Sequence, residues 1–215
     1  MRKLKVLVVT LICFSVVSAQ ESQQAKVDFN STSDLKMTTD YGSYNYEMSD
    51  ILDFEGIDYM KVNFTGKQLK GKAYKITVKE IWNGKVKSES VVVDSKNLGL
   101  PQFATLKTEE FKMRVLSKHT KDNKLQMKFK FPRFSTNVEY KAIKSNDYSL
   151  RNIADESGLE IKYNEKFYLL AYILPYERED GSKSWCEVGT TGKDLENWGK
   201  KFGIKHYLLF EMKFD

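Results

Sequence analysis

Apolar and polar side chains alternate with a period of two along much of this chain. Met60, Val62 and Phe64 alternate with lysine and asparagine, and residues 74–78 repeat the pattern. Such alternation is typical of a β-strand that buries one face in a core and exposes the other to water. The pattern therefore predicts a mainly β protein.

Two pairs of alternating segments are separated by short turn sequences. Asn83 and Gly84 tolerate the positive φ angles of a type I′ turn, so they predict a β-hairpin with a return strand through Val86. Asp122 and Asn123 predict a second hairpin, with arms over residues 111–115 and 125–131.

The C-terminal third predicts two further strands and one helix. Residues 167–174 are apolar throughout, as expected of a central strand, and residues 206–214 alternate again. Between them, Thr191 is a candidate cap for a short helix ending before Gly203. The elements together predict an antiparallel β-sandwich with one short helix near the C-terminus.

The domain organisation follows from the ends of these patterns. Residues 34–215 are expected to form one β-sandwich domain, preceded by a flexible leader over residues 20–33. An alternative is two small sandwiches divided near residues 98–105, where glycine and proline interrupt the pattern. Residues 50–55 are expected to form a turn.

The first nineteen residues have the three parts of a secretory signal peptide. A cationic start precedes an apolar run over residues 6–17, and cleavage is expected between Ala19 and Gln20. The run is too short for a permanent membrane-spanning helix. We therefore expect an exported protein that is periplasmic, extracellular or on the cell surface.

Removal of residues 1–19 changes both the charge and the cysteine content. Three basic residues leave, so the formal net charge falls from +6 to +3, and Cys186 becomes the only cysteine. A secreted chain with one cysteine makes no internal disulfide, which favours a bacterial exported protein. Lysine greatly outnumbers arginine, so the residues that best recognise base edges are scarce and no nucleic-acid partner is expected.

Two segments carry a resemblance to known proteins. The signal ends in Ser18, Ala19 and Gln20, and residues 195–207 read LENWGKKFGIKHY. Together with the excess of lysine over arginine, these segments resemble uncharacterised exported β-sandwich families of Bacteroidetes. The resemblance includes no catalytic motif, and it implies export rather than a particular activity.

No set of residues has the spacing of a catalytic or cofactor-binding motif, so no cofactor is expected. His119 and His206 stand alone, and Asp50, Asp53, Glu55 and Asp58 are weak candidates for a metal site. The competing hypothesis of a secreted hydrolase requires paired carboxylates. Its candidates are Glu177, Glu179 and Asp180.

Aromatic residues suggest the favoured hypothesis, a non-catalytic binding or adhesion module. The candidates for ligand binding are Tyr41, Tyr44, Tyr46, Trp82 and Trp185. Flat aromatic faces suit sugar rings and partner proteins, so the expected ligand is a glycan or a surface protein. The alternative is that these rings fill the sandwich core.

Overall fold

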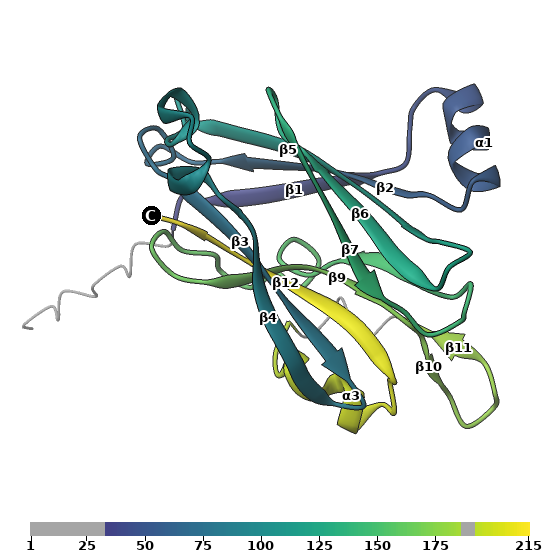
Figure 1. Cartoon of the computed structure of the whole chain (residues 1–215). Helices are drawn as coiled ribbons and strands as arrows, with labels where there is room; N and C mark the ends of the chain where they lie inside the picture. Colours follow the sequence, from purple (N-terminus) through teal and green to yellow (C-terminus); the bar gives the residue numbers. More distant parts are fainter. Residues whose placement is uncertain (1–32, 186–191) are drawn as a thin grey trace, which may run out of the picture. The chain divides into compact units, whose positions relative to one another are not determined.

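A computed structural model of the chain describes residues 33–185 and 192–215 (Figure 1). These residues form two five-stranded antiparallel sheets packed together, and one two-stranded hairpin. The antiparallel β-sandwich and the short helix near the C-terminus are therefore confirmed. The signal segment, most of the leader, Cys186 and Thr191 lie outside the described residues.

The first sheet, here called sheet A, has the strand order β1-β2-β5-β6-β7. Every neighbouring pair in it is antiparallel. Its strands are β1 (Lys36–Tyr41), β2 (Asp58–Thr65), β5 (Glu110–His119), β6 (Lys124–Lys130) and β7 (Ser135–Lys141).

The second sheet, sheet B, has the order β4-β3-β12-β9-β8. The apolar segment over residues 167–174 supplies β9, which lies between β12 and β8 as expected of a strand inside a sheet. The strands of sheet B are β3 (Tyr74–Trp82), β4 (Lys85–Asp94), β8 (Ser149–Asn152), β9 (Phe167–Ile173) and β12 (His206–Phe214).

Both expected hairpins are present, and each belongs to a different sheet. Asn83 and Gly84 have φ angles of 49° and 70° between β3 and β4, and Asn123 has φ 55° between β5 and β6. Residues 95–103, with 3-10 turns η1 (Ser95–Asn97) and η2 (Pro101–Phe103), connect the two hairpins. Each sheet therefore takes strands from both sides of the break near residues 98–105.

Aromatic rings from both sheets meet in the core. Phe64 of β2 contacts Phe214 of β12 edge to face, with ring centroids 5.1 Å apart, and Phe129 of β6 lies 5.3 Å from Phe210. All of these rings have 0 % exposure. Such pairs stabilise a core beyond the area they bury, so they join the two sheets across the interior.

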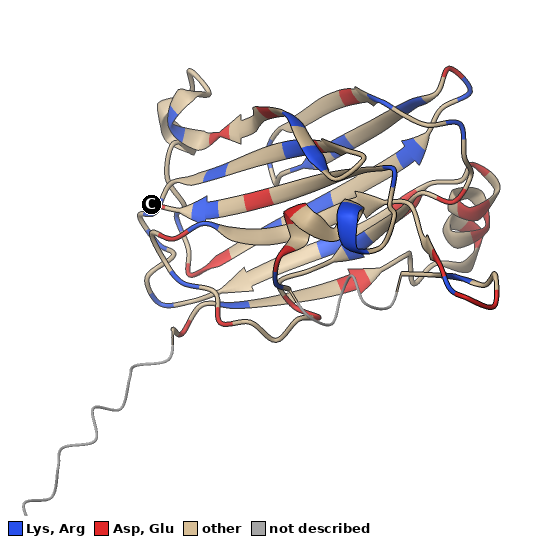
Figure 2. Cartoon of the chain, turned by 90° about the horizontal axis from the view of Figure 1, so that it is seen from below, with Lys and Arg blue, Asp and Glu red and all other residues tan. Residues whose placement is uncertain are grey.

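The outer side of sheet B is covered by the C-terminal helix region. η3 (Leu195–Asn197) and α3 (Trp198–Lys201) lie over β12, and the Tyr207 hydroxyl donates to the Leu195 carbonyl oxygen over 2.6 Å. In Figure 2, α3 is seen in blue over the strands of sheet B. The small hairpin of β10 (Tyr176–Glu177) and β11 (Lys183–Ser184) follows β9. The middle of sheet B, at β12, is thus packed on both faces.

The segment expected to form a turn at residues 50–55 is instead helical, so that expectation was wrong. α1 (Tyr46–Phe54) begins where the Asn45 side chain accepts a hydrogen bond from the Met48 amide over 2.8 Å. Among its residues only Leu52 is buried. Because its exposed side includes large apolar residues, its sequence lacks the simple stripe that indicates an amphipathic helix.

The β3–β4 turn packs against α3 through two glycines (Figure 1). A Cβ atom at Gly199 would lie 2.6 Å from the Cα atom of Gly84. Gly84 also requires its φ of +70°, which other residues rarely adopt. The close approach of the hairpin to α3 therefore depends on both positions lacking a side chain.

We expect Gly199→Ala to lower the free energy of unfolding by about 1–3 kcal/mol, because overpacking at this contact outweighs the better helix propensity of alanine. Lys201→Ala on the same short helix is the control and should stay within about 0.5 kcal/mol of wild type. Urea denaturation measures both. Equal stability of Gly199→Ala and wild type would show that the turn and α3 separate without cost.

Candidate functional site

The outer face of sheet B carries charges that are paired with one another. The Lys79 ammonium lies 2.8 Å from Glu211 and 2.6 Å from Glu196, and Lys166 lies 3.2 Å from Glu211. Burial disfavours the Glu211 carboxylate, but the two lysines outweigh that effect and hold its pKa below the ordinary value. These cations are therefore neutralised within the fold.

The outer face of sheet A has the opposite character. Lys61 of β2, Arg114 of β5 and Lys130 of β6 stand directly opposite one another on three adjacent strands. Like charges in such cross-strand positions destabilise a sheet. Within the described part of the chain, none of the three forms an ion pair with a carboxylate, and neither does nearby Lys128. We call Lys61, Arg114, Lys128 and Lys130 the basic face.

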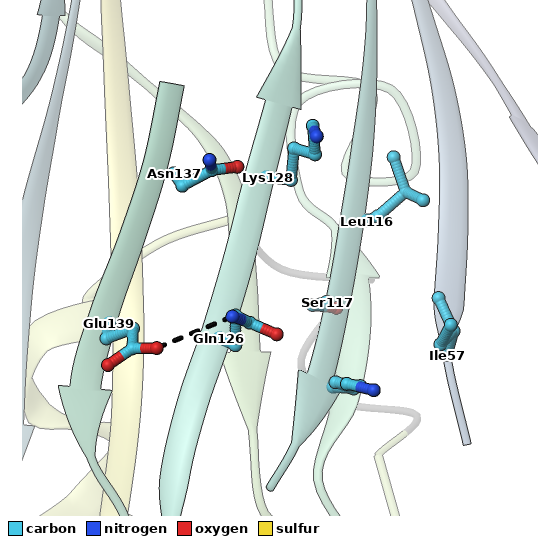
Figure 3. A pocket seen from close by; sticks show the side chains of 8 residues that line it. Ile57, Leu116, Ser117, Gln126, Lys128, Asn137 and Glu139 are labelled. Atoms are coloured by element: carbon cyan, nitrogen blue, oxygen red, sulfur yellow. Dashed lines mark hydrogen bonds between the residues drawn. The ribbon is translucent and has the colours of Figure 1, made fainter. Parts of the chain in front are cut away.

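Two adjoining hollows lie on this face. The hollow of about 650 Å³ is lined by Tyr59 and by Lys61, Arg114 and Lys130 of the basic face. The hollow of about 570 Å³ lies over β5, β6 and β7, where Leu116, Lys128 and Asn137 point outward in a row (Figure 3). Together they make an open surface lined by the four cations of the basic face and also by two carboxylates, Asp40 of β1 and Glu139 of β7.

The segment predicted to bind ligand meets the basic face through Tyr44. The Lys61 ammonium lies 4.0 Å from the centroid of the Tyr44 ring, a cation–π contact. The Tyr44 hydroxyl bonds the Asp40 carboxylate, which stands opposite Lys61 on β1 without forming an ion pair with it. Tyr44 and Tyr46 are 80 % and 88 % exposed, so both rings are available to a partner.

Tyr41 has a structural role as well as a half-exposed ring. Its hydroxyl accepts from the Asn152 amide over 2.9 Å and donates to Glu156 over 3.0 Å. These bonds tie β1, at the edge of sheet A, to the end of β8 in sheet B. Removal of this side chain would therefore disturb the fold along with any ligand contact.

The two candidate tryptophans lie against residues of sheet B. The Trp82 ring lies 4.0 Å from the His206 ring, and the Trp185 indole donates to the Ile173 carbonyl over 3.3 Å. The Arg151 guanidinium lies 5.0 Å from the Trp185 ring. Among the described residues no ring contact joins either tryptophan to the candidate tyrosines.

The carboxylates considered for hydrolysis or metal binding are dispersed. Glu177, Glu179 and Asp180 are exposed on the β10–β11 hairpin, where Asp180 accepts from the Ser182 amide. In residues 33–185 and 192–215, no three histidine, cysteine or acidic side chains are grouped for a metal ion. Of the four acidic candidates, Asp50 and Asp53 lie on α1, Glu55 caps its C-terminal end, and Asp58 begins β2.

A polar cluster inside the sandwich was not expected from the sequence. Tyr148 and His206 Nδ1 share a hydrogen bond of 2.6 Å, and the His119 ring stacks on Tyr148 at 5.7 Å. Burial lowers the pKa of His206 to about 4. The residues come from β5, β12 and the β7–β8 connection, so no local motif could have brought them together.

Asp58, at the first position of β2, is a partly buried carboxylate with a strongly shifted pKa. Burial raises its pKa to about 6, although the Leu150 amide, Arg151 and Tyr172 oppose the shift. The unfolded carboxyl titrates near the ordinary value of 3.8. Its contribution therefore favours the fold at acidic pH and is lost as the pH rises through about 6.

Neither family models, nor curated proteins, nor solved structures gave a match to this chain. No helix in the described residues is long and apolar enough to cross a membrane. The functional argument consequently rests on the geometry and charge of the chain's own residues.

We expect Asp58→Asn to raise the melting temperature at pH 7.5, with a gain of about 1–2 kcal/mol because the cost of a buried charge disappears. At pH 4 the two proteins should melt together, since Asp58 is then largely protonated. The exposed Asp50→Asn is the control, and thermal melts across this range measure all three. An equal effect of Asp58→Asn at both pH values would contradict the burial argument.

Proposed function

We propose that this protein is an exported, non-catalytic binding module whose basic face binds acidic polysaccharides. The observation that supports this function most directly is the row of Lys61, Arg114 and Lys130 without carboxylate partners among the described residues. A row of like charges lowers the stability of the sheet. A polyanion would supply the missing opposite charge.

The contrast between the two sheets strengthens this argument. Lys79 of β3 and Lys166, which precedes β9, have carboxylates within 3.2 Å, so the fold itself neutralises these two cations. Arg114 has no such carboxylate partner in the described part of the chain. Since the cations of the basic face lack ion-pair partners there, their charge is available to an external ligand.

The spacing of the cations suits an extended ligand. Neighbouring strands lie about 4.8 Å apart, so the three cations of the row span about 10 Å across the sheet. Tyr59 lies within the larger hollow, and the exposed Tyr44 ring lies against Lys61 at its edge. Aromatic faces beside cations suit sugar rings that carry carboxylate or sulfate groups.

The chemistry of the cations favours polysaccharide over nucleic acid. Three of the four residues of the basic face are lysines, which act as point charges. Reading of base edges depends mainly on the planar arginine fork. The basic face therefore suits a ligand with regularly spaced charges, which it neutralises without bidentate hydrogen bonds.

We expect the double variant Arg114→Gln/Lys130→Gln to bind heparin and polygalacturonate about tenfold more weakly, since each exposed ion pair contributes up to about 1 kcal/mol. Its melting temperature should equal or exceed that of wild type, because a like-charge contact is removed. Calorimetric titration at several salt concentrations measures the affinities. The binding of the double variant should also depend less steeply on salt.

Lys85→Gln/Lys87→Gln, on exposed positions of β4, removes the same net charge and is the matched control. Retained affinity in this control places binding on sheet A. Equal losses of affinity in both double variants would show that binding depends on net charge alone and contradict a site on sheet A. Tighter binding of a poly(dT) oligonucleotide than of either polysaccharide would assign the face to nucleic acid and overturn the proposal.

A second prediction concerns the tyrosines. Tyr44→Ala should weaken polysaccharide binding by more than about 1 kcal/mol if its ring anchors a sugar, with little change in melting temperature because the ring is exposed. Tyr46→Ala is the comparison, since Tyr46 is similarly exposed but makes no cation–π contact with the basic face in the described part of the chain. Calorimetric titration and thermal melts test both. Unchanged binding by Tyr44→Ala would remove the tyrosine from the site.

A further inference from the structure

A third hollow borders the basic face, sharing Lys112, Phe131 and Pro132 with the larger hollow there, and opens at one end of the sandwich. It has a volume of about 440 Å³ and lies among η2, the start of β5 and the turn between β6 and β7. We call it the aromatic cleft. Its aromatic lining residues are Tyr74, Phe103, Phe111, Phe131 and Phe134.

The rings of the cleft form an ordered wall. Phe131 and Phe134 stack with centroids 4.6 Å apart and an angle of 24° between their planes, and Tyr74 lies 4.5 Å from Phe111. Phe103 lies 6.2 Å from Phe134 at the same angle of 24°. Phe103 and Phe134 are only partly buried, so this wall continues from the core to the surface. Flat faces of this kind favour a planar apolar ligand.

Tyr74 provides a polar group in this apolar setting. The residue is only 4 % exposed, and within the described chain its hydroxyl makes no hydrogen bond. Burial raises the pKa of Tyr74, so the hydroxyl stays protonated and remains a donor. The hydroxyl is not among the buried side-chain atoms that lack a partner, so it reaches water at the cleft, and an acceptor on a ligand can take the place of that water.

Arg133 adds a cation at the cleft. Its guanidinium lies 5.9 Å from the Phe103 ring, and the side chain is exposed. In the described part of the chain Arg133 has no carboxylate within ion-pair distance, whereas neighbouring Lys112 is 2.8 Å from Glu110. A ligand carboxylate near the surface would complete this group too.

We propose that the aromatic cleft binds a planar aromatic carboxylate. The rings of the ligand lie against Phe131 and Phe134, its carboxylate pairs with Arg133, and an oxygen substituent on the ring accepts from the Tyr74 hydroxyl. Each part of the ligand therefore meets a matching group at the cleft. This inference stands independently of the proposed polysaccharide function.

The test uses 2-naphthoate and 6-hydroxy-2-naphthoate as probes in calorimetric or NMR titration. We expect the hydroxylated probe to bind wild-type protein about fivefold more tightly, because only it can engage Tyr74. Tyr74→Phe should abolish this difference while leaving 2-naphthoate binding and the melting temperature unchanged. The comparison remains informative because no hydrogen bond of the free protein is lost.

Two more variants locate the other contacts. Arg133→Gln, at an exposed position, should weaken both probes about fivefold, and Phe134→Ala should weaken both about tenfold. Arg114→Gln/Lys130→Gln should leave naphthoate binding unchanged, which separates this site from the basic face. Failure of polysaccharide binding would leave these expectations intact.

Several results would overturn the inference. Absence of saturable naphthoate binding at millimolar concentration would show that the cleft is not a site for aromatic acids. Unchanged binding in Arg133→Gln and Phe134→Ala would place the probes elsewhere. Tighter binding of decanoate than of either naphthoate would show that the cleft selects a flexible apolar chain rather than a planar ring.

Discussion

The central position of β12 in sheet B is the constraint on which the arrangement of surfaces depends. Its inner side chains, such as Phe210 and Phe214, form the aromatic contacts with sheet A. Its outer side chains include Tyr207, which is fully buried under η3 and α3. Because the middle of sheet B is covered on both faces, the hollow beside β4 is small, at about 380 Å³. The hollows on sheet A measure about 570 and 650 Å³ and offer a ligand broader access.

The distribution of charge determines which kind of ligand suits the open surface of sheet A. The net charge of residues 20–215 is only +3, which on its own indicates no polyanion partner. Ion pairs on sheet B consume Lys79 and Lys166, while Lys61, Arg114 and Lys130 are left together on sheet A. The net charge is therefore modest although positive charge is concentrated on the basic face, because carboxylates neutralise Lys79 and Lys166 but not the cations of the basic face.

The sequence predicted elements better than it predicted sites, for a physical reason. Period-two alternation reports which face of a strand is buried, and this sufficed for β2, β5 and β6. It failed for α1, whose start depends on the Asn45 cap and whose only buried residue is Leu52. It also could not locate the basic face, because alternation marks Lys61 and Lys130 as solvated without stating which strands pair or in which register. Tyr44 was found from its polar surroundings, but its contact with Lys61 required the fold.

The ion pairs of the outer lysines also indicate the direction in which an extended ligand would lie on the basic face. Lys118, toward one end of β5, lies 3.8 Å from Glu55, and Lys112, toward the other end, lies 2.8 Å from Glu110. The cations of the basic face, which have no ion pairs within the described chain, therefore form a strip across the middle of the sheet, bounded by neutralised lysines at both ends of β5. An extended polyanion gains most by crossing the strands from β2 to β6, and a ligand lying along one strand would meet a carboxylate near each end. Under the proposed function, local acidic residues would thus set the orientation of the polysaccharide on the basic face.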